Sequence, residues 1–395
     1  MQPSLNVILF SVGSGGDVMP FVQIGSRLKQ RGHEVKLMTH CNYEENAKRA
    51  SLEFVPVDSP QEYARFIADQ HLLNGPGGIP DFMRRYSFSK VVDHYKLIAQ
   101  ASQSANTVIV TRDLFDTAAR LAAEKLRLPL CWIFVSPLQA TTWKLRQQLF
   151  ADVLRPDVNR ARAALGLPEA VDGEAGGNYP TSTVGLWPEW FAHSELDLPF
   201  DVVPVGFVED DDADKGEIPP SIQNALRSCD TPILITAGTG MYLGADFYAA
   251  SAEACRCLNV VGILVAQHRE QLPGDYPGCV KWLGYLPFGK LMPQVKVVIH
   301  HGGMGTLACA MAAGVPQLVL PKGADRPDNA ARLKQLQIAE FLPPPKWQPA
   351  IIANALIRLL QSPTVSENCR TIAGRLKNSH SATAACEAIE KAGYA

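Results

Sequence analysis

The alternation of short apolar runs with glycine turns and amphipathic helices constrains the fold of this chain more than any other feature. The first such unit consists of the apolar run Val7–Phe10, the glycine turn Val12–Asp17, a helix predicted to begin at Pro20 and to end at Gly32, and the apolar run Val35–Met38. A strand–helix–strand unit of this length predicts neighbouring parallel strands, because parallel strands need a crossover connection.

Further apolar runs predict that the same pattern continues in both halves of the chain. The predicted strands are Phe54–Val57, Thr107–Val110, Leu130–Val135, Ile233–Ile235, Val260–Val265, Val295–Ile299 and Gln317–Leu320, with predicted helices at Thr117–Leu126 and Ala249–Cys257. Residues 70–90 and 140–180 are less regular, and we expect loops there that wall a pocket.

An acidic stretch divides the chain, which at 395 residues is long for one core. Residues 209–214 are mostly acidic and lead into a proline pair, a composition typical of a linker. We predict an N-terminal domain at 1–208, a linker at 209–220, a C-terminal domain at 221–370 and a C-terminal helix at 371–395 that packs back on the first domain. The predicted fold class is α/β, with two doubly wound Rossmann-like domains whose ligands bind beyond the carboxyl ends of the strands.

Composition excludes several classes of protein. The chain is 47% hydrophobic and 19% charged, with a net charge of −2, so neither nucleic-acid binding nor adsorption to an anionic membrane is expected. No apolar run approaches membrane-spanning length, and the N-terminus does not read as a signal peptide; peripheral membrane contact stays open. Nine scattered cysteines indicate reduced thiols and a cytoplasmic protein. The acidic stretch at 209–214 is interpreted as a linker, and no spacing of residues is taken to predict a metal site.

The segment Ile299–Asn329 carries the strongest functional signal. Its order is strand, glycine turn, short helix, strand and polar loop, and the turn contains His301, Gly303, Gly305 and Thr306. A glycine turn that opens a helix presents free backbone N–H groups, so this segment predicts an anion site suited to a diphosphate. Neither common nucleotide fingerprint is present, since Val18 replaces the third glycine of the dinucleotide motif and no P-loop lysine follows a glycine turn.

Two motifs together resemble a known family. The segment 300–329 resembles the donor-binding signature of UDP-sugar-dependent glycosyltransferases of the GT-B fold. Residues 13–21 and 31–35 resemble the start of the sterol-glucosyltransferase and glycopeptide-glycosyltransferase types, including their aspartate, here Asp17. The resemblance implies a UDP-sugar or TDP-sugar as donor substrate, no tightly bound cofactor, and a small lipophilic acceptor bound by the N-terminal domain.

The resemblance also implies roles in donor binding. His301, Gly303, Gly305 and Thr306 match the diphosphate-binding positions, and Ser14 and Thr239 are assigned to the donor with them. The alternative for Thr239 is a plain turn residue. The nucleotide base is expected at the Leu286 backbone; Trp282 or Tyr285 either stacks on it or belongs to the core. Asp325 and Asn329 match the sugar-binding positions. Arg326 departs from the family, which has glutamine there, so it either pairs with Asp325 or favours an anionic sugar.

Asp17 is the predicted general base for the acceptor hydroxyl. An unperturbed aspartate, with a pKa of about 3.9, is too weak to ionise an alcohol in advance, so the proton has to move as the new bond forms. The alternative is a helix-capping role before Pro20. Asp113 matches the aspartate that orients a catalytic histidine in plant relatives, but two carboxylates in contact would repel, so a capping role is favoured there.

The predicted function is an inverting glycosyltransferase that moves a sugar, glucose by default, from a UDP-sugar to an acceptor hydroxyl. Two alternatives stay open on the same fold: a nucleotide-sugar epimerase or hydrolase, and a non-catalytic nucleotide-sugar-binding protein. Arg326 is the residue that keeps the second alternative in play.

Overall fold

The computed structural model divides the chain into two compact units. The N-terminal unit comprises Met1–Val208 with His380–Ala395, and the C-terminal unit comprises Glu209–Ser379. The residues described are 3–74, 77–102, 106–113, 115–170, 179–192, 198–208, 216–239, 244–267, 269–377 and 379–395. Each unit is described separately below.

The N-terminal unit is built on a parallel sheet with the strand order β3-β2-β1-β4-β5-β6-β7 among its described residues. Its strands are β1 Asn6–Phe10, β2 Glu34–Thr39, β3 Glu53–Pro56, β4 Thr107–Arg112, β5 Leu130–Phe134, β6 Ser182–Gly185 and β7 Val203–Pro204. Its helices are α1 Gly15–Gln30, α2 Glu44–Arg49, α3 Pro60–Ala68, α4 Gly78–Tyr86, α5 Val91–Ala101, α6 Thr117–Leu126, α7 Pro137–Thr141, α8 Trp143–Leu149, α9 Arg155–Ala164 and α17 Ser381–Gly393.

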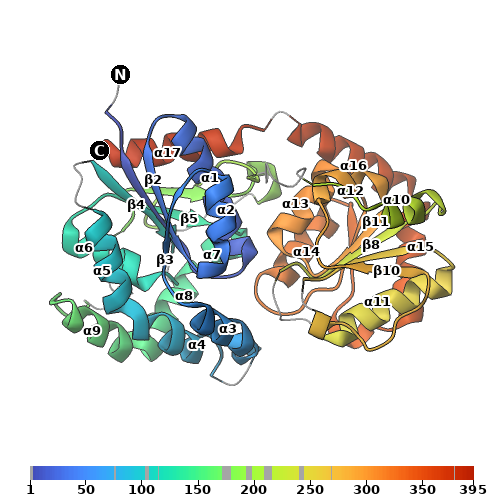
Figure 1. Ribbon diagram of the computed structural model, residues 1–395, viewed down its shortest axis with the longest axis horizontal. Helices are drawn as coiled ribbons and strands as arrows, with labels where there is room; N and C mark the ends of the chain where they lie inside the picture. The colour runs from blue at the N-terminus through green and yellow to red at the C-terminus, as the bar shows by residue number, and fades with distance from the viewer. Residues whose placement is uncertain are drawn as a thin grey trace. The chain divides into compact units, whose positions relative to one another are not determined.

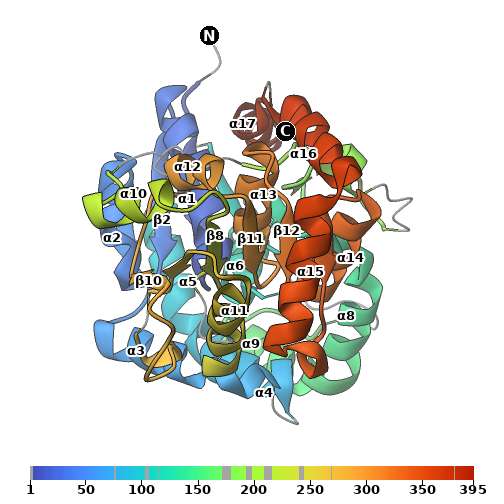
Figure 2. The ribbon, with the colours of Figure 1, turned by 90° about the vertical axis from the view of Figure 1, so that its right-hand side faces the viewer.

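The C-terminal unit repeats this architecture with the parallel order β10-β9-β8-β11-β12-β13 among its described residues (Figure 2). Its strands are β8 Ile233–Thr236, β9 Gly262–Val265, β10 Val280–Leu283, β11 Val297–His300, β12 Gln317–Val319 and β13 Ala339–Phe341. Its helices are α10 Pro220–Arg227, α11 Ala245–Leu258, α12 Phe288–Leu291, α13 Met304–Ala312, α14 Arg326–Gln335, α15 Pro349–Gln361 and α16 Pro363–Leu376. The predicted α/β class with two doubly wound domains is confirmed.

The central strands are buried along their whole length, as expected for parallel strands that have helices on both faces. Every residue of β1, β4, β8 and β11 is buried. In each sheet these two strands are hydrogen-bonded neighbours. Their carboxyl ends therefore lie together at one edge, where polar side chains following a strand leave the core.

The first helix begins earlier than predicted. It starts at Gly15 and contains Pro20, whereas the sequence predicted a start at Pro20. The reason is a capping box, in which Ser14 is the N-cap and Asp17 is the third helical residue. Pro20 is accommodated in the second turn, where its missing N–H costs one backbone hydrogen bond.

The C-terminal helix belongs to the N-terminal unit. The predicted single helix at 371–395 is two helices: α16 ends at Leu376, and α17 runs from Ser381 to Gly393. Figure 1 shows α17, in red, beside α1. The apolar side chains of α17 (Ala385, Cys386, Ile389 and Ala392) join the core that contains β1 and β4.

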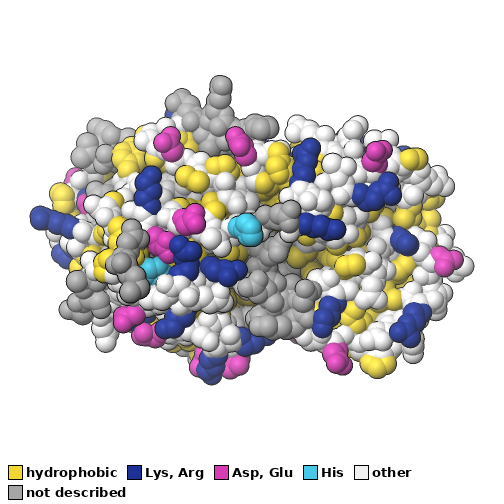
Figure 3. All heavy atoms as spheres, turned by 90° about the horizontal axis from the view of Figure 1, so that it is seen from above, with side chains coloured by type: hydrophobic (Ala, Val, Ile, Leu, Met, Phe, Trp, Pro, Cys, Tyr) yellow, Lys and Arg dark blue, Asp and Glu magenta, His cyan; other side chains and the backbone are white. Residues whose placement is uncertain are grey.

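Most of the predicted linker at 209–220 lies outside the described residues. Residues 216–219 are described, and α10 begins at Pro220. Within the described part of the chain, no helix combines the length and apolar character needed to cross a bilayer. On the face shown in Figure 3, basic and acidic side chains are interspersed, in keeping with the net charge of −2.

Candidate active site

Asp17 lies in the first turn of α1, directly beyond the carboxyl end of β1. Its Oδ2 accepts hydrogen bonds from the Ser14 N–H at 2.9 Å and from the Ser14 hydroxyl at 3.0 Å. The Asp17 side chain is 25% exposed, so part of the carboxylate remains accessible to a ligand. Ser14, which the resemblance assigned to donor binding, here holds Asp17.

The other oxygen of Asp17 is held by an arginine from a neighbouring strand. Arg112, the last residue of β4, donates from Nη1 to Asp17 Oδ1 at 2.5 Å and from Nη2 to the Val12 carbonyl. The same guanidinium donates to both oxygens of Asp116, from Nε at 3.2 Å and from Nη2 at 3.0 Å. One buried cation thus joins two carboxylates.

Burial sets the electrostatics of this group. The Arg112 side chain is 7% exposed and that of Asp116 is fully buried. Burial opposes the charge on Arg112, but the carboxylates of Asp116 and Asp17 raise its pKa above the ordinary value. Burial raises the pKa of Asp116 in spite of the opposing charge of Arg112. Tyr43 also faces this group: burial, followed by the charges of Tyr63 and Asp17, raises its pKa.

Asp113 is engaged elsewhere. Its side chain is fully buried and forms an ion pair with Arg146 of α8. Asp113 and Asp17 were considered as a possible contact pair from their sequence positions. In the structure each carboxylate pairs with a different arginine instead. Asp116, which the sequence analysis did not single out, is the carboxylate linked to Asp17.

Gly13 permits this arrangement. A Cβ at Gly13 would lie 2.4 Å from Asp17 Oδ2, closer than real Cβ atoms approach any atom. A side chain at this position would therefore displace the carboxylate, so glycine is required for Asp17 to fold back onto the turn.

In the C-terminal unit, His301 follows β11 and is enclosed by two glycines. A Cβ at Gly238, beyond β8, would lie 2.7 Å from His301 Cε1, and a Cβ at Gly303 would lie 2.4 Å from His301 Nε2. Gly238 also has φ +71°, a conformation that suits glycine. The imidazole therefore lies against the backbone of both turns, next to the N-terminus of α13.

His301 is uncharged at neutral pH. The residue is 8% exposed, and burial, followed by the charges of Arg326 and His300, holds its pKa well below the ordinary value. A neutral imidazole donates one hydrogen bond. Gly303 is the N-cap of α13, and Gly305 and Thr306 lie in its first turn, so free N–H groups of this turn are adjacent to the imidazole.

The polar loop after β12 is organised by Asn329. This fully buried side chain donates to the Gly302 carbonyl at 2.9 Å and to Asp325 Oδ2 at 3.0 Å. The Asn329 amide nitrogen therefore connects α14 to the glycine turn and orients Asp325, while its buried Oδ1 has no hydrogen-bond partner within the protein. Arg326 is 8% exposed and donates to the Lys322 carbonyl at 2.8 Å.

The stretch that the resemblance assigned to the nucleotide base presents one exposed ring. Tyr285 is 66% exposed, whereas the Leu286 side chain is buried in the core of the unit. Trp282 is partly buried, donates from Nε1 to the Ala266 carbonyl at 3.1 Å and has the Arg269 guanidinium 5.5 Å from its ring centroid. Tyr285 is thus the better placed of the two for stacking on a base.

The remaining predicted residues are placed as follows. Thr239 is exposed in the turn after β8, and Thr306 is 8% exposed. Within the described residues, no group of three His, Cys, Asp or Glu side chains is arranged to hold a metal ion. The sequence analysis missed Arg112 and Asp116; the only available signal was a charged residue ending a buried strand, followed by an acid at the N-cap of α6.

Each end of the chain matches a known protein domain. Residues 7–137 match the glycosyltransferase family 28 N-terminal domain, and residues 235–390 match the C-terminal domain of erythromycin biosynthesis protein CIII-like proteins. The chain is 26% identical over 430 residues to O-mycaminosyltylonolide 6-deoxyallosyltransferase of Streptomyces fradiae, covering 98% of this chain and 97% of that protein.

A plant relative and a solved structure extend the similarity. A sterol 3-beta-glucosyltransferase of Arabidopsis thaliana is 25% identical over 365 residues, covering 82% of this chain and 56% of that protein. The spinosyn rhamnosyltransferase SpnG complexed with thymidine diphosphate superposes with a TM-score of 0.73 at 20% identity, covering 97% of this chain and 99% of that one.

The fold and the two matched domains define the chain as a GT-B glycosyltransferase. Within that class the chain is similar to sterol and antibiotic glycosyltransferases, and its two ends match the family 28 N-terminal domain and the erythromycin CIII-like C-terminal domain.

Proposed function

We propose that this enzyme transfers a sugar from a UDP-sugar or TDP-sugar to a hydroxyl of a small lipophilic acceptor, with inversion at the anomeric carbon and with Asp17 as the general base. Glucose is the default sugar. The observation that carries the proposal is the Asp17 carboxylate, which is held from two sides at the end of β1 and is still 25% exposed.

The proposed acceptor step uses Asp17 in its ionised form. The carboxylate form is the one that accepts a proton, and the Arg112 guanidinium beside it supplies the counter-charge. As the acceptor oxygen bonds to the anomeric carbon, its proton passes to Asp17 and the bond from that carbon to the diphosphate oxygen breaks. Attack in line with the leaving group converts an α-linked donor into a β-linked product.

The proposed donor site is the turn between β11 and α13. Negative charge grows on the diphosphate as the sugar leaves, and donors already aimed at that charge stabilise it. The N–H groups at the start of α13 and the neutral His301 are suited to this role. We assign Gly303, Gly305 and Thr306 to the diphosphate. The remaining donor contacts are taken from the resemblance: Ser14, Thr239, the base at Leu286 and the sugar at Asp325 and Arg326.

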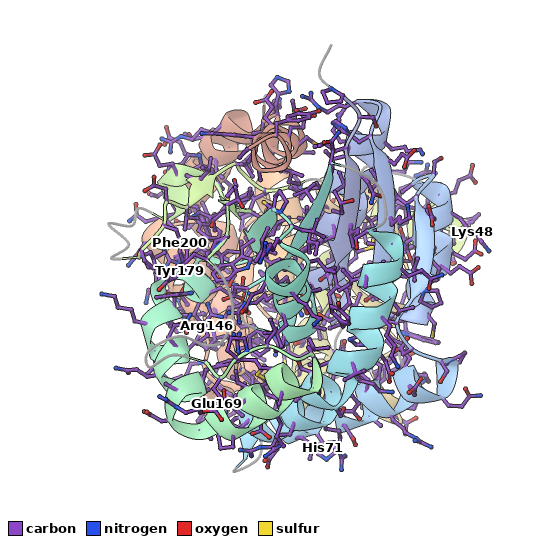
Figure 4. All side chains as sticks on the ribbon, turned by 90° about the vertical axis from the view of Figure 1, so that its left-hand side faces the viewer. Lys48, His71, Arg146, Glu169, Tyr179 and Phe200 are labelled. Carbon is purple, nitrogen blue, oxygen red and sulfur yellow. The ribbon has the colours of Figure 1, made fainter. Side chains whose placement is uncertain are left out.

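The lipophilic acceptor is supported by apolar surface in the N-terminal unit. Leu145 is 65% exposed and Tyr179 is 51% exposed. Figure 4 shows Tyr179 beside Phe200, with their ring centroids 6.2 Å apart, and Phe200 also packs edge-on against Trp143. The related enzymes whose names include a sterol or a macrolide aglycone are in keeping with such an acceptor. Nine cysteines without a disulfide are in keeping with a cytoplasmic location.

The test measures release of nucleoside diphosphate from a panel of UDP- and TDP-sugars, with and without hydrophobic alcohols. We expect turnover only when an acceptor is present. The Asp17→Asn variant should lower turnover by on the order of 100-fold to 10,000-fold, the usual contribution of a general base, and should leave UDP affinity nearly unchanged.

Other outcomes favour the alternative functions. Turnover without an acceptor would identify a hydrolase or an epimerase, and tight nucleotide binding without any turnover would identify a binding protein. If Asp17→Asn abolishes UDP binding as well, the residue has a structural role as the capping partner of Ser14.

A further inference from the structure

The carboxylate proposed as the base is tied to a buried arginine, and this creates a difficulty. Arg112 contacts Asp17 Oδ1 at 2.5 Å, so the guanidinium and the carboxylate balance each other's charge before the reaction. After the proton has moved, Asp17 is neutral and no longer balances the guanidinium. A buried cation without a counter-charge is costly, so Arg112 alone would oppose the reaction.

Asp116 removes this difficulty. Both of its oxygens accept from Arg112, and it also accepts from the Arg112 N–H at 3.3 Å and from the Thr111 hydroxyl at 3.2 Å. Its side chain is fully buried, so solvent cannot take over its role. With Asp116 present, the group carries a net charge of −1 before proton transfer, and a neutral Arg112–Asp116 pair remains afterwards.

We propose that Arg112 and Asp116 are positioning residues for Asp17: Arg112 holds the carboxylate in place, and Asp116 balances the guanidinium so that Asp17 can accept the proton of the acceptor. This inference rests on the proposed role of Asp17 as the base. In this arrangement the carboxylate that supports the base is Asp116 and not Asp113.

Three neighbouring elements contribute charged or titratable groups to this arrangement. Arg112 comes from β4, Asp116 is the N-cap of α6, and the charge of Asp17 acts on Tyr43, the last residue of the 3-10 turn Cys41–Tyr43. The charge of Asp113, which pairs with Arg146, also acts on Arg112. The buried tyrosine is uncharged, because burial raises its pKa. The balance at Asp17 therefore depends on Arg112 and Asp116.

The test compares kinetics of Asp116→Asn with those of the native enzyme across pH. The substitution keeps the size of the side chain and removes its charge. We expect kcat to fall on the order of 10-fold with the donor KM unchanged, since base strength limits proton transfer. We expect the acid limb of the kcat/KM profile to move to lower pH, because the charge of Arg112 is then balanced by Asp17 alone.

Two further variants separate positioning from folding. Asp157→Asn is the matched control: Asp157 is also a buried carboxylate held by arginines, Arg84 at 3.0 Å and Arg160, and its loss should leave the acid limb in place. Arg112→Lys keeps the charge but cannot hold both carboxylates in a fork, so kcat should fall on the order of 10-fold or more. Urea unfolding verifies that the N-terminal unit of each variant is folded, and UDP-binding stoichiometry counts the donor sites.

The outcomes distinguish this proposal from the one on which it rests. If Asp17→Asn stays active, the base assignment and this inference both fail. If Asp17→Asn is inactive while Asp116→Asn keeps the native acid limb and kcat per UDP-binding site, this inference alone fails. A shifted acid limb in Asp116→Asn, absent in Asp157→Asn, supports it.

Discussion

At the scale of single residues, backbone space decides where the candidate catalytic groups lie. Gly13 leaves room for Asp17, and Gly238 and Gly303 leave room for the imidazole of His301. Because these glycines have no Cβ, they leave space for the functional side chain beside them. A motif rich in glycine is therefore informative about its neighbours as much as about its own flexibility.

The first prediction concerns Gly303→Ala. The added Cβ would lie 2.4 Å from His301 Nε2, so the ring has to move away from the start of α13. We expect UDP affinity to fall on the order of 10-fold, which corresponds to the loss of about one hydrogen bond to a charged group. His301→Ala should cause a similar loss. Isothermal titration calorimetry with UDP measures both.

The comparison for that prediction is Gly305→Ala in the same turn. A Cβ at Gly305 meets nothing within 4 Å, so the fold and the position of His301 should be retained. If Gly303→Ala binds UDP as tightly as the native protein, the placement of His301 does not matter for nucleotide binding. A loss confined to Gly305→Ala would instead indicate that the phosphates approach that Cα closely.

At the scale of secondary structure elements, α17 is attached to the N-terminal unit by charge as well as by apolar packing. Glu390 pairs with Arg31 at 2.6 Å and with His33 at 2.9 Å, and the Leu5 N–H donates to His33 Nδ1 at 3.2 Å. The hydrogen bond from Arg31 lowers the pKa of Glu390 against the opposing effect of burial. This stabilising contribution is therefore full above the unfolded-state pKa of the carboxyl and is lost as pH falls through the lowered value.

The second prediction is that Glu390→Ala destabilises the N-terminal unit by about 1–3 kcal/mol, because it removes the partner of Nε2 in the largely buried His33. Glu387→Ala, an exposed acid on the same helix, should cost less than about 0.5 kcal/mol. Urea unfolding measures both variants. Equal stability of the two would show that apolar packing alone attaches α17.

At the scale of the whole molecule, buried histidines set the acid limit of stability. Burial lowers the pKa of His94, in the N-terminal unit, to about 4, and burial also lowers the pKa of His300, in the C-terminal unit, to about 4. Both values lie below that of the unfolded chain, so the unfolded state binds the proton first. Stability is therefore complete above the ordinary histidine pKa and declines as pH falls toward 4.

The third prediction is a loss of up to about 3 kcal/mol per buried histidine between pH 6.5 and 4, since each pKa unit corresponds to about 1.4 kcal/mol. His94→Gln should remove its share of this slope, and His71→Gln, at the exposed position labelled in Figure 4, should leave the slope unchanged. Urea unfolding at neutral and acid pH measures the slopes. An unchanged slope in His94→Gln would contradict the prediction.

Much of the fold could be predicted because strands and helices depend on residues that are close together in the sequence. Helix α6 has the bounds that its periodicity predicted, strand β2 extends the predicted run by one residue at each end, and strand β8 extends it by one residue at its carboxyl end. Strands β6, β7, β10 and β13 were missed, because they are only two to four residues long and none of them is buried along its whole length. A short run that is half exposed leaves no distinct period.

The same distinction between local and long-range interactions applies to the candidate site. By itself the sequence determined the alternating strands and helices, the two glycine turns and the candidate residues in them, since each depends on neighbours a few positions away. Only the tertiary structure decided that Arg112, 95 residues from Asp17, holds its carboxylate, and that Glu390, 359 residues from Arg31, anchors the last helix. Such pairs follow from strand order and helix docking, which set distances that local periodicity does not contain.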